Sequence, residues 1–302
     1  MSNSKTNPYH FKMGLKTKLL NIFRRIFTFY PLEKLLLYLH LRFPNKFLEK
    51  IIPLEYLYPH GSIRKVTRNG INYQLDISKN VDHFYYWGYP DISHHAIIND
   101  IQSSGVILDV GANIGSMSLL YAKLNPSATI YAFEPHPDLF KIALHNLSLN
   151  PFKNIHLFNK GLGNKQGLLR LYEVNEHNPG MNRIVAAELD APFKEIEIIQ
   201  LDTFITEQQI TCVDLIKIDV EGFEYAVLEG AMQTLKKHTP TLILELDDTN
   251  LKANNASAQQ LINLLASLGY NQFYDLDTKH TITTETDFKN CHFDLIAKKL
   301  KP

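Results

Sequence analysis

The stretch Val106–Ser118 reads VILDVGANIGSMS and decides the fold of this chain. Its apolar start, Val106–Asp109, is typical of a buried parallel strand that ends in a carboxylate at the sheet edge. Gly111 and Gly115 then predict a tight turn, and Ser116–Leu124 predicts a helix. A strand, a glycine turn and a helix N-terminus together bring backbone N–H groups close to a ligand. Glycine is expected at these positions because a side chain would occupy the ligand's space.

A second acid, Glu134, closes the next apolar run, Thr129–Phe133. It follows the glycine turn by about 20 residues, the distance at which such folds place an acid on the ribose hydroxyls of an adenosine-containing cofactor. Dinucleotide folds carry G-x-G-x-x-G, but Asp109 stands here at the first glycine position. An acid there suits a ligand with an amino group and a sulfonium and would repel a pyrophosphate. The residues favour S-adenosylmethionine over a nicotinamide cofactor; an ordinary strand–turn–helix without a ligand is the alternative.

Composition indicates one large α/β domain with an appendage. The chain has 302 residues, 31 basic and 31 acidic side chains, and a hydrophobic content of 45%. This overall neutrality gives no reason to expect nucleic-acid binding. Residues 1–60 nevertheless carry ten Lys and Arg against three Glu, a net charge of +7. Cys212 and Cys291 show no metal-ligand spacing, which indicates a reduced, cytoplasmic protein.

The first 60 residues are predicted to form a basic helical extension. From Leu15 to Tyr30 apolar residues recur on one helical face, with Lys and Arg on the other. Such a helix can lie on an anionic membrane surface, or it can dock on its own catalytic domain with the basic face solvated. Pro31 is expected to end it, and Leu32–Leu41 to form a second helix. The apolar runs are too short to span a bilayer, and Arg24-Arg25 interrupts the single candidate signal-peptide core. We expect a cytoplasmic protein, with contact at the inner membrane face left open.

The region 61–105 is predicted to lead into the main domain. Ile63–Thr67 and Ile71–Ile77 flank Asn69-Gly70, a pair favoured in two-residue hairpins. The aromatic stretch His83–Pro90 is expected as a loop, which either lines a sugar or ring pocket or packs into the core. A helix from Ser93 to about Gln102 should follow.

The remaining pattern alternates strands with helices and predicts a doubly wound, mostly parallel sheet over 61–302. The further expected strands are Ile155–Asn159, Leu168–Val174, Glu195–Leu201, Val213–Asp219, Pro240–Leu246, and an antiparallel pair formed by Gln272–Asp275 and His292–Lys298. The further expected helices are Pro137–Leu149, one running from after Glu224 to Lys237, and Ser257–Leu268. The polar segment His177–Pro192 is a candidate substrate loop.

Acidic residues end several of these strands. Ligands in such sheets bind at the carboxyl ends of the strands, where Asp109, Glu134, Asp219 and Glu245 should gather. Clustered carboxylates suit Mg²⁺, so a site formed by Asp219, Glu221 and Glu245 is an open alternative, although no resident metal is predicted. Lys217 shares a strand face with Asp219 and needs an acidic partner in so apolar a strand.

With these motifs in place, the chain resembles the FkbM-type S-adenosylmethionine-dependent methyltransferases. The resemblance rests on DVGANIGSMS at Asp109–Ser118, AFEPHP at Ala132–Pro137 and LIKIDVEGFEYAVLEGA at Leu215–Ala231, and it extends from about Tyr86 to Lys298. It implies a Rossmann-like class I methyltransferase sheet with an antiparallel final strand. It also implies O-methylation of hydroxyls on glycans, glycolipids or natural products. The acceptor would be a small molecule or a glycan.

The resemblance implies roles for particular residues. It implies that the methionine and ribose portions of the cofactor are held by Asp109, Gly111, Ala112, Asn113 and Gly115. It also implies that Glu134 binds the ribose hydroxyls and that Pro135 and Gly161 flank the adenine. Methyl transfer requires an aligned acceptor oxygen, exclusion of water and a base for one proton. Asp219 is the first candidate base, followed by Glu221 and Glu224, although acids in a first helical turn also serve as caps. A nicotinamide-dependent oxidoreductase and a non-catalytic adenosyl-binding module are the two alternatives.

Overall fold

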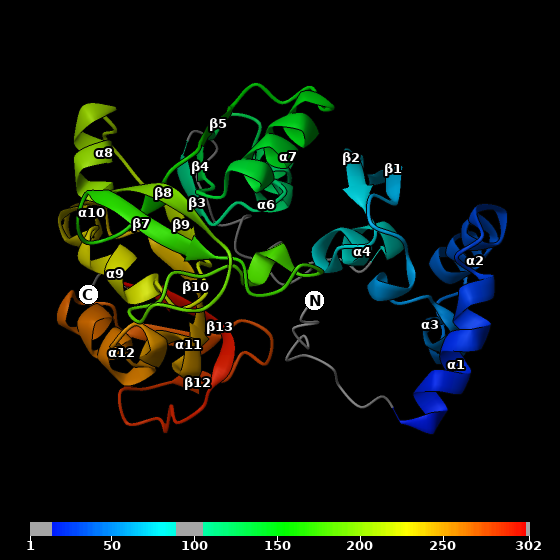
Figure 1. Cartoon of the computed structure of the whole chain (residues 1–302). Helices are drawn as coiled ribbons and strands as arrows, with labels where there is room; N and C mark the ends of the chain where they lie inside the picture. The colour runs from blue at the N-terminus through cyan, green and yellow to red at the C-terminus, as the bar shows by residue number, and fades with distance from the viewer. Residues whose placement is uncertain (1–13, 89–104, 300–302) are drawn as a thin grey trace. The chain divides into compact units, whose positions relative to one another are not determined.

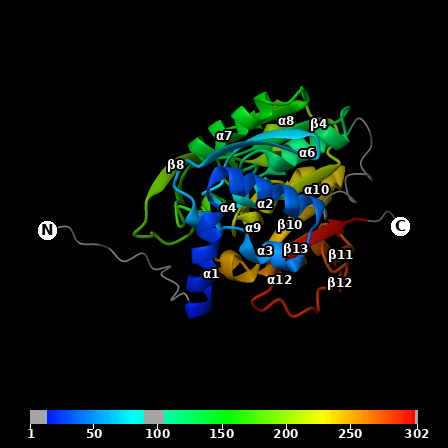
Figure 2. The ribbon, with the colours of Figure 1, turned by 90° about the vertical axis from the view of Figure 1, so that its right-hand side faces the viewer.

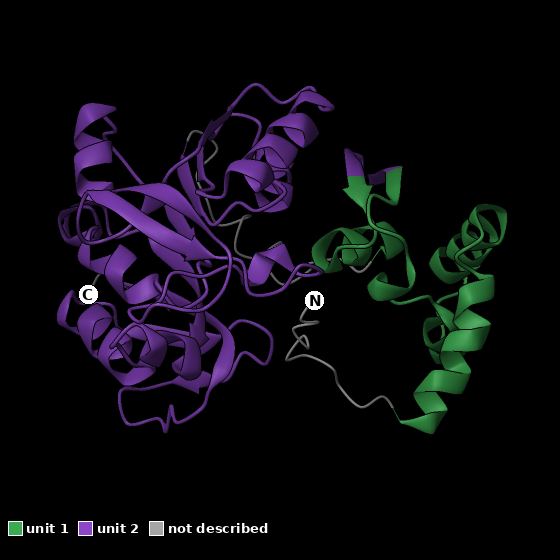
Figure 3. Cartoon of the chain, viewed as in Figure 1, with its two compact units in different colours: residues 1–64, 75–89 green, residues 65–74, 90–302 purple. Residues whose placement is uncertain are grey.

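The computed structural model describes residues 14–88 and 105–299, which fall into two compact units (Figure 3). The first unit comprises the described residues of 1–64 and 75–89, and the second those of 65–74 and 90–302. The predicted boundary after residue 60 separates most of these residues. It places residues 75–88 with the methyltransferase domain, whereas in the structure these residues pack with the N-terminal helices.

The first unit is helical. Its elements are α1 (Leu15–Ile26), α2 (Tyr30–Arg42), α3 (Lys46–Ile51), a 3₁₀ turn (Glu55–Leu57) and α4 (Asn80–Trp87). The prediction that one helix reaches Tyr30 and ends at Pro31 is wrong, because Pro31 lies in the first turn of α2. Proline is well tolerated there, since first-turn N–H groups have no partner within the helix. No helix among the described residues is long and apolar enough to cross a membrane.

The predicted hairpin is confirmed as β1 (Ile63–Arg68) and β2 (Ile71–Asp76). The turn residues Asn69 and Gly70 both have positive φ, 49° and 71°, as a type I′ turn requires. The hairpin tip, residues 65–74, belongs to the second unit. There the backbone N–H of Gln74 donates to Asn146 Oδ1 at 2.9 Å.

The aromatic stretch is a helix as far as Trp87, not the predicted loop. In α4 the side chains of His83, Tyr86 and Trp87 follow a helical spacing and are all buried. The Tyr86 hydroxyl donates to Glu33 Oε1 at 2.6 Å, and His83 Nε2 lies 2.7 Å from the carbonyl oxygen of Pro53. These aromatic residues form the core of the first unit. Tyr89, Pro90 and the predicted helix at 93–102 lie outside the described residues.

Among the described residues, the second unit contains an eight-stranded sheet with the order β12-β11-β13-β10-β9-β3-β4-β5 (Figure 1). Its strands are β3 (Val106–Val110), β4 (Thr129–Phe133), β5 (Ile155–Phe158), β9 (Leu215–Ile218), β10 (Thr241–Asp247), β11 (Gln272–Asp275), β12 (Thr281–Ile282) and β13 (His292–Lys298). Strands β5, β4, β3, β9 and β10 are parallel, and β13 lies antiparallel between β10 and β11 (Figure 2). This confirms the expected class I methyltransferase sheet with its antiparallel final strand.

A smaller sheet is inserted after β5. It has the order β6-β8-β7, with β6 (Gly161–Leu162), β7 (Gly167–Tyr172) and β8 (Phe193–Ile199). The antiparallel pairing of β7 with β8 confirms the predicted inserted hairpin. Between these two strands lies the predicted substrate segment, which contains a 3₁₀ turn (Pro179–Met181).

The second unit's helices connect the strands, and two of them were not predicted, α8 and α11. The helices are α6 (Ser116–Leu124), α7 (Pro137–Ser148), α8 (Leu201–Glu207), α9 (Glu224–Glu229), α10 (Met232–His238), α11 (Asp248–Ala253) and α12 (Ala258–Ser267). The single helix predicted up to Lys237 is divided at Gly230-Ala231. A Cβ atom at Gly230 would lie 2.0 Å from the carbonyl oxygen of Gly163. Glycine at this break therefore lets the α9–α10 connection approach the loop after β6 closely.

Candidate active site

The glycine loop after β3 packs directly against the loop after β9. Gly111 has a φ of +83°, and a Cβ atom there would lie 1.9 Å from the carbonyl oxygen of Asp219. At Gly115, a Cβ would lie 2.8 Å from a methyl group of Leu147 on α7. The prediction placed ligand in the space beside these glycines. In the structure neighbouring protein atoms occupy it. Contact with the backbone of Asp219 requires glycine at position 111, whereas Gly115 faces the flexible tip of Leu147 and is favoured by its φ of +81°.

Glu134, at the end of β4, is bonded to the glycine loop. Its Oε2 accepts the backbone N–H of Asn113 and its Oε1 that of His136, both at 2.8 Å. Asn113 itself has a φ of +52°, which turns this N–H toward the acid. Burial raises the pKa of Glu134 to about 7. A carboxylate oxygen can accept more than one hydrogen bond, so these two bonds do not use the full acceptor capacity of Glu134.

Asp109 lies beneath this loop and forms part of a buried ionic cluster. It is fully buried, and its Oδ2 accepts a hydrogen bond from the Ser118 hydroxyl at 2.5 Å. Lys217 Nζ, on the adjacent strand β9, lies 3.8 Å from Asp109 Oδ1 and 3.1 Å from Asp219 Oδ2. The same ammonium donates to the carbonyl oxygen of Gly111 at 3.1 Å. Burial disfavours the charge, but Asp219 and Asp109 outweigh it and raise the pKa of Lys217, so this lysine ties the two loops together as a cation.

Three carboxylates meet at the carboxyl ends of β9 and β10. Asp219, Glu221 and Glu245 each offer an oxygen, and these oxygens lie within 4.8 Å of one another. Asp219 is about half exposed, with 48% of its side chain accessible, whereas Glu245 is mostly buried. Burial and the charges of Asp219 and Glu221 raise the pKa of Glu245. The donor set is one that hard divalent cations accept, so the geometry keeps the magnesium alternative open.

Glu221 is held in an unusual backbone conformation within this cluster. Its φ is +53°, a left-handed value that is uncommon for a residue with a side chain. Burial, followed by the nearby charge of Asp219, raises the pKa of Glu221 to about 7. Backbone strain and a shifted pKa in one residue are typical of functional positions.

Glu224, the third predicted base, lies inside the protein. Its side chain is 1% exposed, and its Oε1 accepts the backbone N–H groups of Val220 and Gly222, both at 3.1 Å. Glu224 therefore clamps the loop that carries Asp219 and Glu221, the capping role that acids often have in a first helical turn.

Two residues that the sequence analysis did not single out support Glu221. Asn250 Nδ2 donates to Glu221 Oε2 at 3.0 Å, and Arg183 donates to Asn250 Oδ1 at 3.0 Å. Arg183 comes from the predicted substrate segment and Asn250 from α11. No spacing in the sequence links them to Glu221, because the three residues meet through tertiary structure alone.

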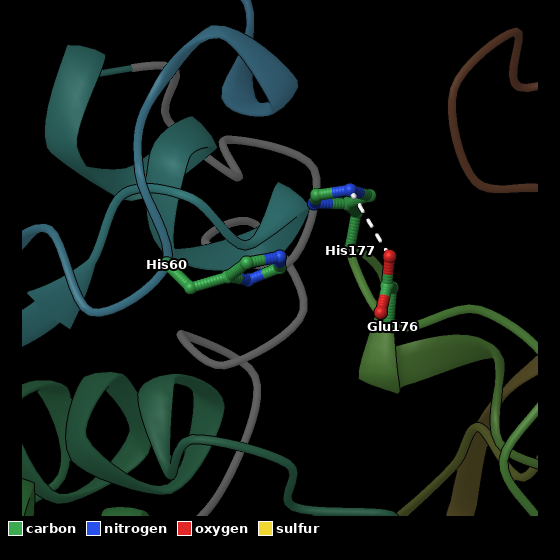
Figure 4. Close-up of side chains that lie close together, drawn as sticks. All are labelled: His60, Glu176 and His177. Atoms are coloured by element: carbon green, nitrogen blue, oxygen red, sulfur yellow. Dashed lines mark ion pairs between the residues drawn. The ribbon is translucent and has the colours of Figure 1, made fainter.

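The two residues expected beside the adenine also lie close together. A Cβ atom at Gly161 would lie 3.5 Å from Cβ of Pro135. At the start of the predicted substrate segment, His177 Nε2 lies 3.6 Å from Oε1 of the preceding residue, Glu176, which the dashed line in Figure 4 marks. The segment thus presents polar side chains on the same unit as the carboxylate cluster.

The fold and the site together define a class I methyltransferase. The chain belongs to the family described as the methyltransferase FkbM domain, whose model matches residues 109–271, more than half of the chain. As a member of this family, it is an S-adenosylmethionine-dependent methyltransferase. Membership favours this reading over the nicotinamide-dependent and non-catalytic alternatives.

Several characterised proteins are similar to this chain. The 2-O-methyltransferase NoeI of Sinorhizobium fredii is 25% identical over 189 residues, covering 58% of this chain and 76% of NoeI. The hexuronic acid methyltransferase AglP of Haloferax volcanii is 27% identical over 140 residues, covering 46% of this chain and 55% of AglP. The crystal structure of an FkbM methyltransferase from Methylobacillus flagellatus aligns at a TM-score of 0.46 and 18% identity, over 72% of this chain and 52% of that one.

Proposed function

We propose that this methyltransferase acts on a sugar hydroxyl of a glycan, glycolipid or glycoside. The observation that carries the proposal is the half-buried Glu221 carboxylate beside Asp219, at the end of the strand next to the glycine loop. A sugar hydroxyl is a weak nucleophile and requires such a base. NoeI is named as a 2-O-methyltransferase and AglP as a hexuronic acid methyltransferase, which supports oxygen on a sugar as the acceptor.

The cofactor roles assigned to the glycine-loop side of the site form part of this proposal. Glu134 takes the ribose hydroxyls, and Gly111, Ala112, Asn113 and Gly115 shape the methionine and ribose region. Pro135 and Gly161 flank the adenine. Because Asp109 is fully buried against Ser118 and Lys217, it acts by holding the loop in place.

On the acceptor side, the surroundings of the three candidate bases support a different role for each. Glu221 receives the acceptor's proton, since its raised pKa of about 7 makes it a stronger base than an ordinary glutamate. Asp219 is ion-paired with Lys217 and orients the acceptor hydroxyl. Glu224 positions the loop from inside. The bound cofactor supplies an electrophilic methyl group, and the chain contributes alignment, exclusion of water and proton transfer.

The test is a transfer assay with S-adenosylmethionine carrying a labelled methyl group. Uronic acid glycosides, neutral hexosides and non-sugar alcohols or phenols are offered in parallel, and products are located by mass spectrometry and NMR. We expect label on a sugar oxygen and none on the non-sugar set. Turnover of the non-sugar hydroxyls alone, or label on nitrogen or carbon, would refute the sugar assignment while leaving the methyltransferase class intact.

The cytoplasmic location expected from the sequence also remains a proposal. Fractionation of cells that express the full chain would test it: the chain should appear with cytoplasmic markers, or with the inner membrane face if the N-terminal helices bind lipid.

A further inference from the structure

Helix α1 of the first unit turns its apolar face outward. The apolar side chains that recur at helical spacing are exposed, with Ile22 and Phe23 each 62% accessible. We call this surface the α1 apolar face, and its members are Leu15, Leu19, Ile22, Phe23 and Ile26, all between 52% and 74% exposed. An amphipathic helix of a globular protein normally buries this stripe.

The polar side of α1 is the side that docks. Asn21, the one buried residue of the helix, donates from Nδ2 to the Tyr56 hydroxyl at 3.0 Å. Arg24 donates from Nε to the carbonyl oxygen of Lys50 at 2.9 Å and from Nη1 to Asn21 Oδ1 at 3.1 Å. These directed bonds fix the rotation of the helix about its axis. Within the first unit, α1 therefore docks by its polar side and not by its apolar side.

The next two helices continue the exposure of apolar groups. In α2 the inward positions are Glu33, Leu36 and His40, while Leu35 and Tyr38 are more than half exposed. Of the 21 large apolar side chains that are exposed among the described residues, twelve fall between residues 15 and 47. Scattered single apolar residues need no explanation, but this concentration on consecutive helices marks an interaction surface.

Positive charge surrounds this surface. Residues 14–51 carry eight Lys and Arg against two Glu, a net charge of +6. On α1, the exposed residues Lys16, Lys18 and Arg25 border the α1 apolar face. Of the two acids, Glu33 is buried and bonded to Arg64 through two hydrogen bonds of 2.7 and 2.8 Å, so it does not offset the surface charge.

We propose that the α1 apolar face inserts into the headgroup region of an anionic lipid bilayer, with the bordering cations on the lipid phosphates. Apolar side chains flanked by Lys and Arg are the pattern of a helix that lies in the plane of the membrane interface. A second copy of the chain fits less well, because a symmetric contact would bring two surfaces of like charge together. This inference concerns the first unit and does not depend on which acceptor the second unit methylates.

Vesicle flotation of the full chain tests the proposal. Phosphatidylcholine vesicles with and without phosphatidylglycerol are compared at low and high salt. The double variant Ile22→Gln/Phe23→Gln should weaken binding at least about a hundredfold, because two large apolar side chains lose their burial in the bilayer. Replacing Lys16, Lys18 and Arg25 by Gln should weaken it about fivefold per charge. The matched control Leu168→Gln/Leu169→Gln removes an exposed apolar pair of β7 and should leave binding unchanged.

Each contrary result is distinct. Absence of flotation with anionic vesicles, or equal flotation with neutral ones, would overturn the proposal. So would a dimer in sedimentation velocity that Ile22→Gln/Phe23→Gln dissociates, because it would assign the face to a second copy. Circular dichroism of each variant ensures that a loss of binding reflects the surface and not unfolding. Methyl transfer to a soluble acceptor should survive the Ile22→Gln/Phe23→Gln change, which separates this test from that of the proposed function.

Discussion

At the scale of single residues, the site depends on acids whose surroundings differ sharply. Glu134 and Glu224 are both buried and both accept two backbone N–H groups. Glu134 does so at the edge where ligands bind in such sheets, and Glu224 does so beneath a loop. Glu221 is less buried and is held by Asn250. The same side-chain chemistry clamps a loop at Glu224, and we propose that it supplies a cofactor ligand at Glu134 and a base at Glu221.

The role of Glu134 is tested by the variant Glu134→Gln. It replaces charge-assisted hydrogen bonds by neutral ones, so we expect the affinity for S-adenosylhomocysteine to fall about tenfold to a hundredfold. Isothermal titration calorimetry measures this directly. The control Glu197→Gln changes an exposed acid that pairs with Lys160 and should bind as the wild type does. Equal affinity in all three proteins would remove Glu134 from the cofactor site.

The pKa of Glu221 predicts how activity depends on pH. As pH falls through about 7, its carboxylate gains a proton and can no longer accept one, so kcat should decline there and not near the ordinary glutamate value of about 4.3. Glu221→Gln should lower kcat about 10²- to 10⁴-fold and abolish this acidic limb. The control variant Glu229→Gln changes an exposed acid on α9 that pairs with Asn164, and it should keep the wild-type kcat and the acidic limb of the pH profile. A full-rate Glu221→Gln enzyme would contradict the assignment.

At the scale of elements, the close approach of two loops organises the site. The glycine loop after β3 and the loop after β9 touch at Gly111 and Asp219, and Lys217 bonds to both. This contact places the cofactor side of the site next to the carboxylate cluster. The contact leaves no room for a side chain at Gly111.

Two glycine substitutions separate steric contact from backbone strain. Gly111→Ala places a Cβ atom 1.9 Å from the carbonyl oxygen of Asp219 at a φ of +83°. Gly61→Ala introduces nearly the same strain, at a φ of +77°, with no neighbour within 4 Å. We expect Gly61→Ala to cost about 1–2 kcal/mol and Gly111→Ala about 1–3 kcal/mol more. Thermal unfolding measures the loss of stability in each variant, and S-adenosylhomocysteine binding measures the effect on the cofactor site. Equal losses of stability in the two variants would show that the loop contact contributes nothing.

At the scale of the whole molecule, the chain is built from two units with separate cores. The first is centred on the buried Glu33, which Arg64 and Tyr86 hold, and on the rings of α4. The second is centred on the apolar strands of the large sheet. We expect the second unit to keep its cofactor site when the first is destabilised.

Glu33→Ala tests this division. It leaves the Arg64 guanidinium without its carboxylate, and loss of one partner of a buried ion pair costs about 3–5 kcal/mol. Hydrogen exchange should accelerate in α2 and α4, while exchange in β3, β4 and β9 and the affinity for S-adenosylhomocysteine stay unchanged. The control variant Glu49→Ala removes an exposed acid of α3 and should alter neither the hydrogen exchange nor the affinity for S-adenosylhomocysteine. Loss of cofactor binding in Glu33→Ala would mean that the two units are energetically one.

The sequence by itself determined the large sheet and the position of its ligand edge. The runs that became β3, β4, β9 and β10, the hairpin turn at Asn69-Gly70, and the pairing of the glycine loop with Glu134 all follow from local pattern and spacing. Local pattern suffices here because buried parallel strands, turns and helix starts each require residue types that are readable over a few positions.

Only the tertiary structure decided how individual side chains are used. It turned α1 with its apolar face outward, folded the aromatic stretch into α4, buried Glu224 and brought Arg183 and Asn250 to Glu221. These outcomes depend on bonds between residues far apart in the chain. Such bonds leave no periodic trace in the sequence, because each partner's own neighbours would look the same without them.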